Sequence, residues 1–302
     1  MKVNRWNVYY EVEGEGEPVL LLHGIPTSSF IWRRQIEALS SRFRVYAPDL
    51  LGWGHSDKPP DFDYTVRAYV EFVDGFLAQV SAQRVILCVH DLGGAIGLAF
   101  LGRYPEKVSR LIVLNTFAYL PPIKYLPWAV LYGFLYRLPV LGDPLNRLVW
   151  ETTVRRTDTF VTLAFHNKKL VTKELVAKYR ELNRGTRLTD LRVLLANGIG
   201  GITGAVDQNS FNVRVPTLIV WAENDVLFPP WAALRLHRNI PGSILKTIPK
   251  CGHFLQEEKP DEVNRQLLEF LTQPLSAVRE NSTIHERAES PIATANGRAA
   301  GH

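Results

Sequence analysis

The stretch Ile86-Leu-Cys-Val-His-Asp-Leu-Gly-Gly94 decides the fold of this chain of 302 residues. An apolar, strand-like run stops at Asp91, two glycines follow, and a helix-like run then covers Ala95–Arg103. A strand, a tight turn and a helix in this order are typical of a nucleophile elbow, which holds one side chain above the edge of a parallel sheet. Small residues are needed there because the incoming strand and the outgoing helix almost touch.

The residue at the turn is a carboxylate, Asp91, where nucleophile elbows usually carry Ser. A carboxylate can attack an electrophilic carbon and form an ester with the enzyme, which water must then cleave. This chemistry favours the opening of epoxides or the displacement of halide. The alternative is that Asp91 only caps the following helix, as Asp commonly does. The motif alone does not decide between the two.

Composition places the chain among globular proteins. A hydrophobic content of 46% is enough for one large core, or for a core plus a subdomain. The two cysteines, Cys88 in an apolar run and Cys251 in a loop, do not suggest a disulfide framework. The N-terminal segment Met1–Glu11 is polar and alternating, unlike a signal peptide. We therefore expect a reducing, cytoplasmic location.

The charge distribution argues against two classes of partner. Residues 117–210 hold 13 Lys and Arg against seven Asp and Glu, within a net charge of +5. They do not form a compact stripe interleaved with aromatic residues, so no nucleic-acid partner is predicted. The most apolar stretch, Tyr119–Leu141, is interrupted by four prolines and two basic residues, so no transmembrane segment is predicted. The sequence gives no indication of the oligomeric state.

Strand-like and helix-like segments alternate along most of the chain, which predicts an α/β fold with a parallel sheet. The expected strands are Val3–Glu13, Pro18–Leu22, Phe43–Ala47, Arg84–Val89, Leu111–Leu114, Val215–Trp221 and Ser243–Ile248. The expected helices are Ile31–Leu39 (with Ser28 or Ser29 as N-cap), Tyr64–Val80, Ala95–Arg103, Leu234–Asn239 and Pro260–Leu271.

Residues 117–210 interrupt this alternation. They are rich in Leu, aromatic and basic residues, and we expect them to form a wholly helical cap over the carboxyl ends of the strands, where ligands bind in open α/β sheets. Residues 1–116 and 211–273 then form the core. Residues 274–302 lose apolar periodicity and gain small, polar and charged residues, which predicts a disordered tail.

A carboxylate nucleophile needs a base that activates water for the second step. His253 is the candidate, because it lies after the last expected strand and before the last expected helix, where the chain order of nucleophile, acid and His would place it. Asp225, after the strand that ends at Trp221, is the candidate acid that orients the imidazole. Glu223 is its rival, and the sequence separates the two only weakly.

The oxyanion formed on the ester needs backbone N–H donors. One should come from Leu92, directly after the nucleophile, and the other from Ile25, in the loop after the first central strand. The neighbouring His23 is expected to tie that loop down by hydrogen bonds. We assign no proton-transfer role to His90, and we interpret His55 as turn chemistry.

Five motifs in this order resemble the α/β-hydrolase superfamily, and within it the epoxide hydrolases and haloalkane dehalogenases, whose nucleophile is Asp. They are His23-Gly24-Ile25-Pro26, Asp49-Leu50-Leu51-Gly52-Trp53-Gly54-His55-Ser56-Asp57-Lys58-Pro59, the Asp91 elbow, Asp225 and Gly252-His253. The similarity covers roughly residues 5–272. It implies an eight-stranded, mostly parallel sheet with an inserted helical cap, and neither a metal nor an organic cofactor.

The halide site of the dehalogenases is not matched. Those enzymes usually hold the leaving halide with a Trp directly after the nucleophile and an Asn in the loop after the first central strand, positions that fall on Leu92 and Ile25 here. Leu92 also differs from the Arg that is typical of fluoroacetate dehalogenases. Some family members carry their acid where this chain has Asn115. Aliphatic side chains give halide no N–H donor, so the usual halide site is absent.

Epoxide opening needs an acid in the cap that protonates the ring oxygen, typically a pair of tyrosines, one of them sometimes His. Tyr136 is the first choice from its distance past the elbow, and Tyr132, Tyr179 and His166 are further candidates. The second tyrosine of the family often precedes an Arg near the end of the cap, where this chain has Leu191-Arg192. For each cap tyrosine, packing is the alternative role.

We therefore expect an epoxide hydrolase, in which Asp91 attacks a small hydrophobic epoxide and His253, oriented by Asp225, activates the water that releases a diol. The nearest alternative is a haloalkane or haloacid dehalogenase with atypical halide donors. A further alternative is another hydrolase or lyase on the same scaffold, in which Asp91 has a different role. The non-enzyme alternative is a small-molecule binding protein that uses the pocket under the cap.

Overall fold

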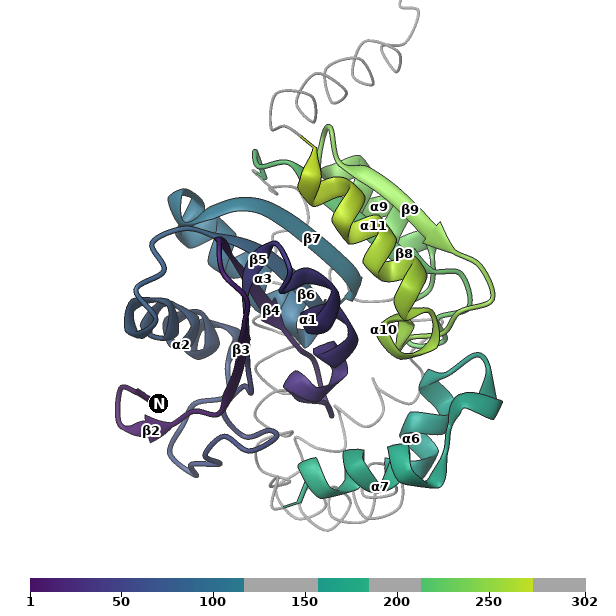
Figure 1. The fold of residues 1–302 in the computed structure, drawn as a ribbon, viewed down its shortest axis with the longest axis horizontal. Helices are drawn as coiled ribbons and strands as arrows, with labels where there is room; N and C mark the ends of the chain where they lie inside the picture. Colours follow the sequence, from purple (N-terminus) through teal and green to yellow (C-terminus); the bar gives the residue numbers. More distant parts are fainter. Residues whose placement is uncertain (117–156, 185–212, 274–302) are drawn as a thin grey trace, which may run out of the picture.

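The computed structural model describes residues 1–116, 157–184 and 213–273, and Figure 1 shows its ribbon. Seven strands form one sheet in the order β3-β5-β4-β6-β7-β8-β9. Every neighbouring pair is parallel except β3 and β5 at one edge, which are antiparallel. The strands are β3 (Tyr10–Glu13), β4 (Glu17–Leu22), β5 (Phe43–Pro48), β6 (Val85–Asp91), β7 (Val108–Thr116), β8 (Thr217–Ala222) and β9 (Ile244–Ile248).

The expected count of eight strands is not met in the described ranges, because the N-terminus does not join the sheet. Strand β1 (Lys2–Val3) pairs instead with β2 (Trp6–Asn7) in a separate antiparallel hairpin. Its turn includes Asn4 at φ 54°, a left-handed conformation that Asn tolerates better than most residues. The alternating run Val3–Glu13 is therefore divided between this hairpin and the edge strand β3.

The helices follow the expected alternation with the strands. They are α1 (Arg33–Leu39), α2 (Val66–Gln79), α3 (Leu92–Arg103), α6 (Thr157–Ala164), α7 (Lys173–Leu182), α9 (Trp231–Asn239), α10 (Leu255–Glu258) and α11 (Pro260–Thr272), with short 3₁₀ turns η1 (Ser29–Trp32), η2 (Pro105–Lys107) and η5 (Lys168–Leu170). Polar caps fix several starts: the side chains of Ser28, Thr65 and Thr172 accept hydrogen bonds from backbone N–H groups of the first turns.

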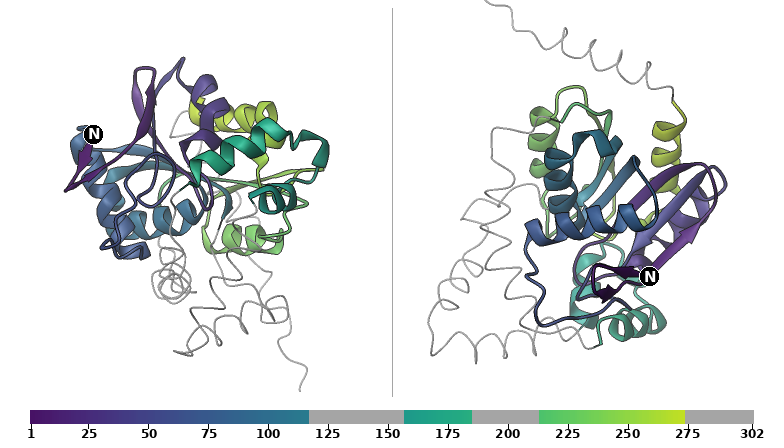
Figure 2. Two further views of the ribbon diagram at one scale, coloured as in Figure 1. Left: turned by 90° about the horizontal axis from the view of Figure 1, so that it is seen from below. Right: turned by 90° about the vertical axis from the view of Figure 1, so that its left-hand side faces the viewer.

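Helices cover both faces of the sheet, as the views in Figures 1 and 2 show. The central strand β6 is buried along its whole length, and its apolar residues alternate between two cores. Leu87 and Val89 belong to the core with α2, α3 and α9, whereas Ile86 and Cys88 belong to the core with α1 and α11. This double burial fixes the register of the strand that ends in Asp91.

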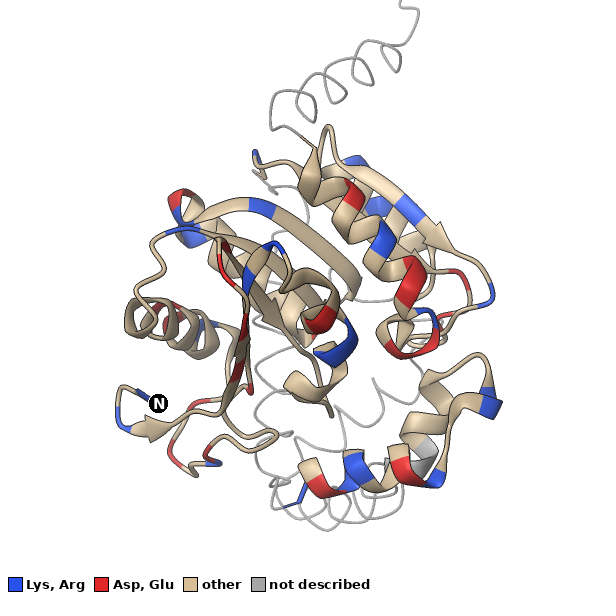
Figure 3. Ribbon diagram, viewed as in Figure 1, with Lys and Arg blue, Asp and Glu red and all other residues tan. Residues whose placement is uncertain are grey.

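Residues 157–184 are the part of the expected cap that the structure describes, and α6 and α7 make it helical. Charged residues gather on α7 (Figure 3), while Val176, Tyr179 and Leu182 on its other side are buried. The remainder of 117–210 and the expected tail 274–302 lie outside the described residues, so the division into core, cap and tail stays a prediction. Within the described ranges, no helix is long and apolar enough to cross a membrane.

The elbow helix α3 provides a matched pair of glycines that tests the close approach of helix and strand. A Cβ at Gly93 would lie 2.3 Å from the backbone oxygen of Leu22, whereas a Cβ at Gly102 would meet nothing within 4 Å. We expect Gly93→Ala to lower the free energy of unfolding by about 1–3 kcal/mol or more, because backbone must move. Gly102→Ala should leave it unchanged or raise it by up to about 1 kcal/mol.

Denaturant unfolding of the two variants and of the natural protein measures both effects on one helix. Equal free energies of unfolding for Gly93→Ala and Gly102→Ala would contradict the tight elbow.

Candidate active site

Asp91 is the last residue of β6 and directly precedes α3. Its backbone has φ 52° and ψ −122°, a left-handed conformation that is uncommon for a residue with a side chain. Neighbouring contacts hold it there: the hydroxyl of Thr116, at the end of β7, donates to the backbone oxygen of Asp91 at 2.6 Å. A Cβ at Gly94 would lie only 1.5 Å from that hydroxyl. The turn thus presents the carboxylate at the carboxyl end of the sheet, as an elbow requires.

The carboxylate of Asp91 has one of the two expected backbone donors. Its Oδ1 accepts a hydrogen bond from the N–H of Ile25 at 2.8 Å. This approach depends on Gly24, because a Cβ there would lie 2.1 Å from the same oxygen. Leu92, the other expected donor, is buried at the first position of α3, but the contacts of the described residues give no hydrogen bond from its N–H to this carboxylate.

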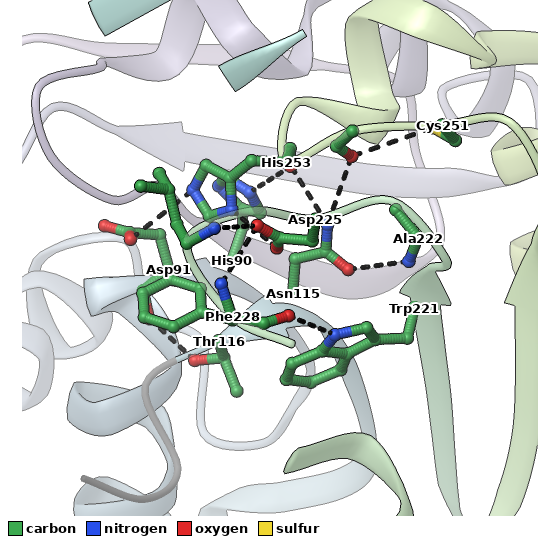
Figure 4. A network of polar contacts seen from close by, with 12 residues as sticks. His90, Asp91, Asn115, Thr116, Trp221, Ala222, Asp225, Phe228, Cys251 and His253 are labelled. Carbon is green, nitrogen blue, oxygen red and sulfur yellow. Dashed lines mark hydrogen bonds and ion pairs between the residues drawn. The ribbon is translucent and has the colours of Figure 1, made fainter. Parts of the chain in front are cut away.

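His253 and Asp225 come from two loops that meet beside Asp91 (Figure 4). His253 Nδ1 lies 2.9 Å from Asp225 Oδ2, and His253 Nε2 lies 3.5 Å from Asp91 Oδ2. The other oxygen of Asp225 accepts from the N–H groups of Leu227 and Phe228 at 2.8 and 3.0 Å, which fixes the carboxylate in the loop after β8. A carboxylate held in this way can select the imidazole tautomer with Nδ1–H and leave Nε2 facing the nucleophile.

Glu223, the rival acid, lies elsewhere. It is exposed and accepts a hydrogen bond from the hydroxyl of Thr247 on β9. Two residues further along the loop, the backbone has turned so that Asp225 is buried and reaches His253. The geometry therefore favours Asp225 as the partner of the imidazole.

The main chain of His253 is held on both sides by residues for which the sequence predicts no such role. Its backbone oxygen accepts from His90 Nε2 at 3.1 Å and from Asn115 Nδ2 at 3.2 Å, and its N–H donates to the backbone oxygen of Ala164 at 2.7 Å. The side-chain oxygen of Asn115 also accepts from the N–H of Ala222 at 2.9 Å. The one signal for Asn115 in the sequence is its place at the end of a buried strand.

Electrostatics set the protonation of the site. Burial alone would lower the pKa of His253, but the carboxylates of Asp225 and Asp91 outweigh this effect and raise it to about 9. Burial would raise the pKa of Asp91, and the hydrogen bond and charge of His253 more than offset it, so the pKa of Asp91 is lowered. The two carboxylates thus favour the protonated form of the His253 imidazole in the free enzyme.

The other histidines of the motifs are neutral or structural. Burial lowers the pKa of His90 to about 3, so its Nε2–H donates to the backbone of His253 without a transferable second proton. His23 ties down its loop: Nδ1–H donates to the oxygen of Gly24 at 2.7 Å, and Nε2 accepts from Leu50 at 2.9 Å. Burial also lowers the pKa of His23. His55 packs its ring edge-on against Tyr9, in the turn.

The cap candidates for an oxygen donor fall into two groups. Tyr136 and Tyr132 lie outside the described residues. The hydroxyl of Tyr179 is fully buried and donates to Glu257 at 2.7 Å, and burial together with this carboxylate raises its pKa well above the ordinary value. His166 is exposed. The hydroxyl of Tyr179 is therefore already engaged with Glu257, whereas a donor role for His166 stays a prediction.

Within residues 1–116, 157–184 and 213–273, no three His, Cys, Asp or Glu side chains group as ligands for a metal ion. The expectation that the protein needs neither metal nor cofactor stays a prediction. The residues that meet at Asp91 are suited to nucleophilic attack and to water activation, because they comprise a carboxylate, an imidazole and an orienting acid.

Comparison with known proteins places the chain in a family. A family model described as the α/β hydrolase fold matches residues 17–260. The chain is 30% identical, over 88% of its own length and 85% of the relative, to a cis-3-alkyl-4-alkyloxetan-2-one decarboxylase of Shewanella oneidensis. It is 28% identical, over 88% of its length and 92% of the relative, to haloalkane dehalogenase 2 of Mycobacterium tuberculosis.

A solved structure agrees with these sequence matches. The epoxide hydrolase of Bacillus megaterium, crystallised with an inhibitor, is 26% identical and superposes with a TM-score of 0.71, over 90% of this chain and 99% of that one. The mostly parallel seven-stranded sheet with helices on both faces agrees with the fold that the matched family model describes. The chain therefore belongs to the α/β-hydrolase fold family of enzymes.

Proposed function

We propose that this protein is an epoxide hydrolase that opens a hydrophobic epoxide through an ester on Asp91. The observation that carries the proposal is the carboxylate on the elbow, with its Oδ2 3.5 Å from the Nε2 of His253. A carboxylate in this position forms an alkyl ester, whereas Ser at an elbow forms an acyl ester. The similarity to epoxide hydrolases supports the same chemistry.

The first step is an attack by one oxygen of Asp91 on an epoxide carbon. The new C–O bond forms as the ring C–O bond breaks, and the ring oxygen takes a proton from a cap acid. We assign this donor role to Tyr136, which lies outside the described residues. Because its pKa is lowered, Asp91 is ionised and ready to attack at neutral pH.

The second step is hydrolysis of the ester. Water adds to the ester carbonyl of Asp91 while His253 Nε2 takes its proton. Collapse of the oxyanion breaks the C–O bond between the ester carbonyl and the diol, and the leaving diol oxygen takes that proton back from His253. The proton on the new carboxyl group of Asp91 returns through solvent to the donor Tyr136, which restores the carboxylate and the cap acid. The N–H groups of Ile25 and Leu92 stabilise the oxyanion, and the Ile25 N–H is 2.8 Å from Asp91 Oδ1 in the free enzyme. Asp225 stabilises the imidazolium that forms.

A dehalogenase is the second candidate, supported by the similarity to haloalkane dehalogenase 2. The same ester would form with loss of halide. Leu92 and Ile25 stand where those enzymes usually place halide donors, so other N–H groups would have to hold the ion. Halide release distinguishes this candidate from epoxide opening, whose product is a diol and no halide.

A lyase is the third candidate, because the 30% identical relative from Shewanella oneidensis is named as an oxetanone decarboxylase. Attack by Asp91 on C4 of such a ring would break the C4–O bond and free the ring carboxylate. Loss of CO2 would then form the alkene and expel Asp91, without consuming water. This route needs no water-activating base, so it predicts a different behaviour of His253 variants. A protein that only binds its ligand would need neither base nor nucleophile.

Removal of the base His253 should trap the ester on Asp91. We expect His253→Phe, incubated with terminal epoxides, to accumulate an adduct equal to the whole epoxide mass, because attack proceeds and hydrolysis stalls. Intact-protein mass spectrometry measures the adduct. Asp91→Asn is the control and should carry none.

Other outcomes of the same measurement separate the candidates. An alkyl adduct from a haloalkane, with the halogen missing, would make the protein a dehalogenase. Turnover of an oxetanone to alkene and CO2 that survives in His253→Phe would make it the lyase. No adduct from any electrophile and no oxetanone turnover would contradict the proposed nucleophile.

The two acids of the loop after β8 offer a second test. We expect Asp225→Asn to reduce kcat by about 100-fold or more, because the imidazole loses the acceptor that sets its tautomer. Glu223→Gln, two residues away and exposed, should leave kcat within about twofold. Comparable losses in both variants would contradict the assignment of Asp225.

The protonation of His253 gives a test that does not depend on substrate. Because the charge of Asp91 helps to raise the pKa of His253 to about 9, Asp91→Asn should lower that pKa. Formation of the ester removes the same charge, so the pKa of His253 falls and more of the imidazole is neutral when it must accept a proton. Hydrolysis of the ester should therefore speed up with rising pH, through a midpoint below that of His253 in the free enzyme.

The imidazole resonances of His253, followed by NMR titration in the natural protein and in Asp91→Asn, measure this difference. An unchanged midpoint in Asp91→Asn would contradict the electrostatic coupling of the pair.

A further inference from the structure

A second carboxylate, outside the three-residue site, is bound to the backbone of the His253 loop. Glu258, the last residue of α10, is buried and accepts three backbone N–H groups. Its Oε1 lies 2.7 Å from the N–H of Gly252 and 2.8 Å from that of His166, and its Oε2 lies 2.8 Å from that of Asn167. A buried carboxylate with several N–H donors is a strong, charge-assisted anchor.

The three donors come from two segments that are far apart in sequence. Gly252 directly precedes His253, whereas His166 and Asn167 follow α6 in the segment expected to be part of the cap. The N–H of His253 donates to Ala164 in that same segment, at 2.7 Å. Glu258 therefore joins the peptide before the base to the end of α6.

The two segments touch so closely that only glycine fits between them. A Cβ at Gly252 would lie 2.4 Å from the oxygen of Ala164 and 2.6 Å from Glu258 Oε1. The ring of Phe165 packs edge-on, with a centroid distance of 5.8 Å, against the ring of Phe254, the residue that directly follows the base in the chain. The loop after α6 is itself closed by Lys168, whose ammonium donates to the oxygens of Thr162 and Phe165.

We propose that Glu258 is a positioning residue for His253. It binds the loop of the base to the end of α6, and this attachment aims Nε2 of His253 at the water that it activates. The inference rests on the proposed ester mechanism and deepens it. Ester formation uses Asp91, which the N–H of Ile25 holds at 2.8 Å, whereas the hydrogen bonds of the Glu258 carboxylate go to the backbone of Gly252 and of the segment after α6. Ester hydrolysis needs Nε2 of His253 aimed at a water, and a displacement of about 1 Å can cost up to about 100-fold in rate. Glu258 should thus affect the second step and spare the first.

Glu258→Gln is the sharpest variant because it keeps the size of the side chain. An amide offers one oxygen acceptor and presents an NH2 group to the remaining N–H, so at least one of the three hydrogen bonds is lost. The matched control is Glu257→Gln in the same helix. Glu257 is also a buried carboxylate, but it pairs with Arg33 and Tyr179 and not with the backbone of the His253 loop.

The test follows the ester through one turnover. An epoxide that labels His253→Phe is mixed with each variant, and quenched samples are read by intact-protein mass spectrometry. For Glu258→Gln we expect hydrolysis of the ester to slow by about tenfold or more, with its formation within about twofold of the natural protein. The adduct should accumulate during turnover. For Glu257→Gln, both rates should keep their natural ratio.

The outcomes separate the inference from the proposed function. If Glu258→Gln slows both steps equally, or behaves as Glu257→Gln does, the positioning role is overturned. If His253→Phe forms no adduct with any epoxide, the proposed function fails first. Thermal unfolding checks that each variant is folded at the assay temperature. Glu258→Asp, which keeps the charge and is shorter by one methylene, replaces Glu258→Gln if that protein does not fold, and should show the same change in ratio.

Discussion

One buried imidazole between two carboxylates is the interaction on which the site depends. His253 has no exposed surface, and its ring nitrogens lie 2.9 Å from Asp225 and 3.5 Å from Asp91. Burial of a charged imidazole is costly unless opposite charges and hydrogen bonds accompany it. Each partner must therefore be held in place by the fold, and each is: Asp91 by the elbow, Asp225 by the N–H groups of Leu227 and Phe228.

The sheet makes this convergence possible. Strands β6, β7 and β8 are neighbours and parallel, so their carboxyl ends bring Asp91, Asn115 and the loop of Asp225 to one edge. Two of these positions have left-handed backbone, with φ 52° at Asp91 and φ 27° at Asn115. Backbone strain of this kind persists when surrounding contacts over-determine it, and it concentrates at functional sites.

The sequence predicted the elements that rest on local rules. The apolar run into Asp91-Leu-Gly-Gly and the alternation of strands and helices follow from periodicity and small residues. The choice between Asp225 and Glu223 was open, because it depends on how a loop turns after β8. The hairpin of Lys2–Asn7 is not predicted, because alternation of polar and apolar residues indicates a strand but not the strand with which it pairs. The roles of Asn115 and Glu258 are not predicted for a related reason. Both side chains bind backbone groups of distant segments, and such contacts require no particular residue type in the partner segment, so the sequence carries no pattern for them.

Helices α6 and α7, in the segment expected to be part of the cap, contact both loops that flank Asp91. The end of α6 binds the His253 loop through Ala164 and Glu258, and the side chain of Asn183, after α7, donates to the oxygen of Pro26 in the Ile25 loop at 2.8 Å. Asn183 Nδ2 also donates to the oxygen of Tyr179 at 2.9 Å, which ties that contact to α7. Helices α6 and α7 thus join the loop of the proposed base to the loop of the proposed oxyanion donor, so the positions of the two loops are coupled through one pair of helices. Because these contacts reach backbone groups, substitution of exposed side chains on α6 and α7 leaves the three side chains Asp91, Asp225 and His253 in place.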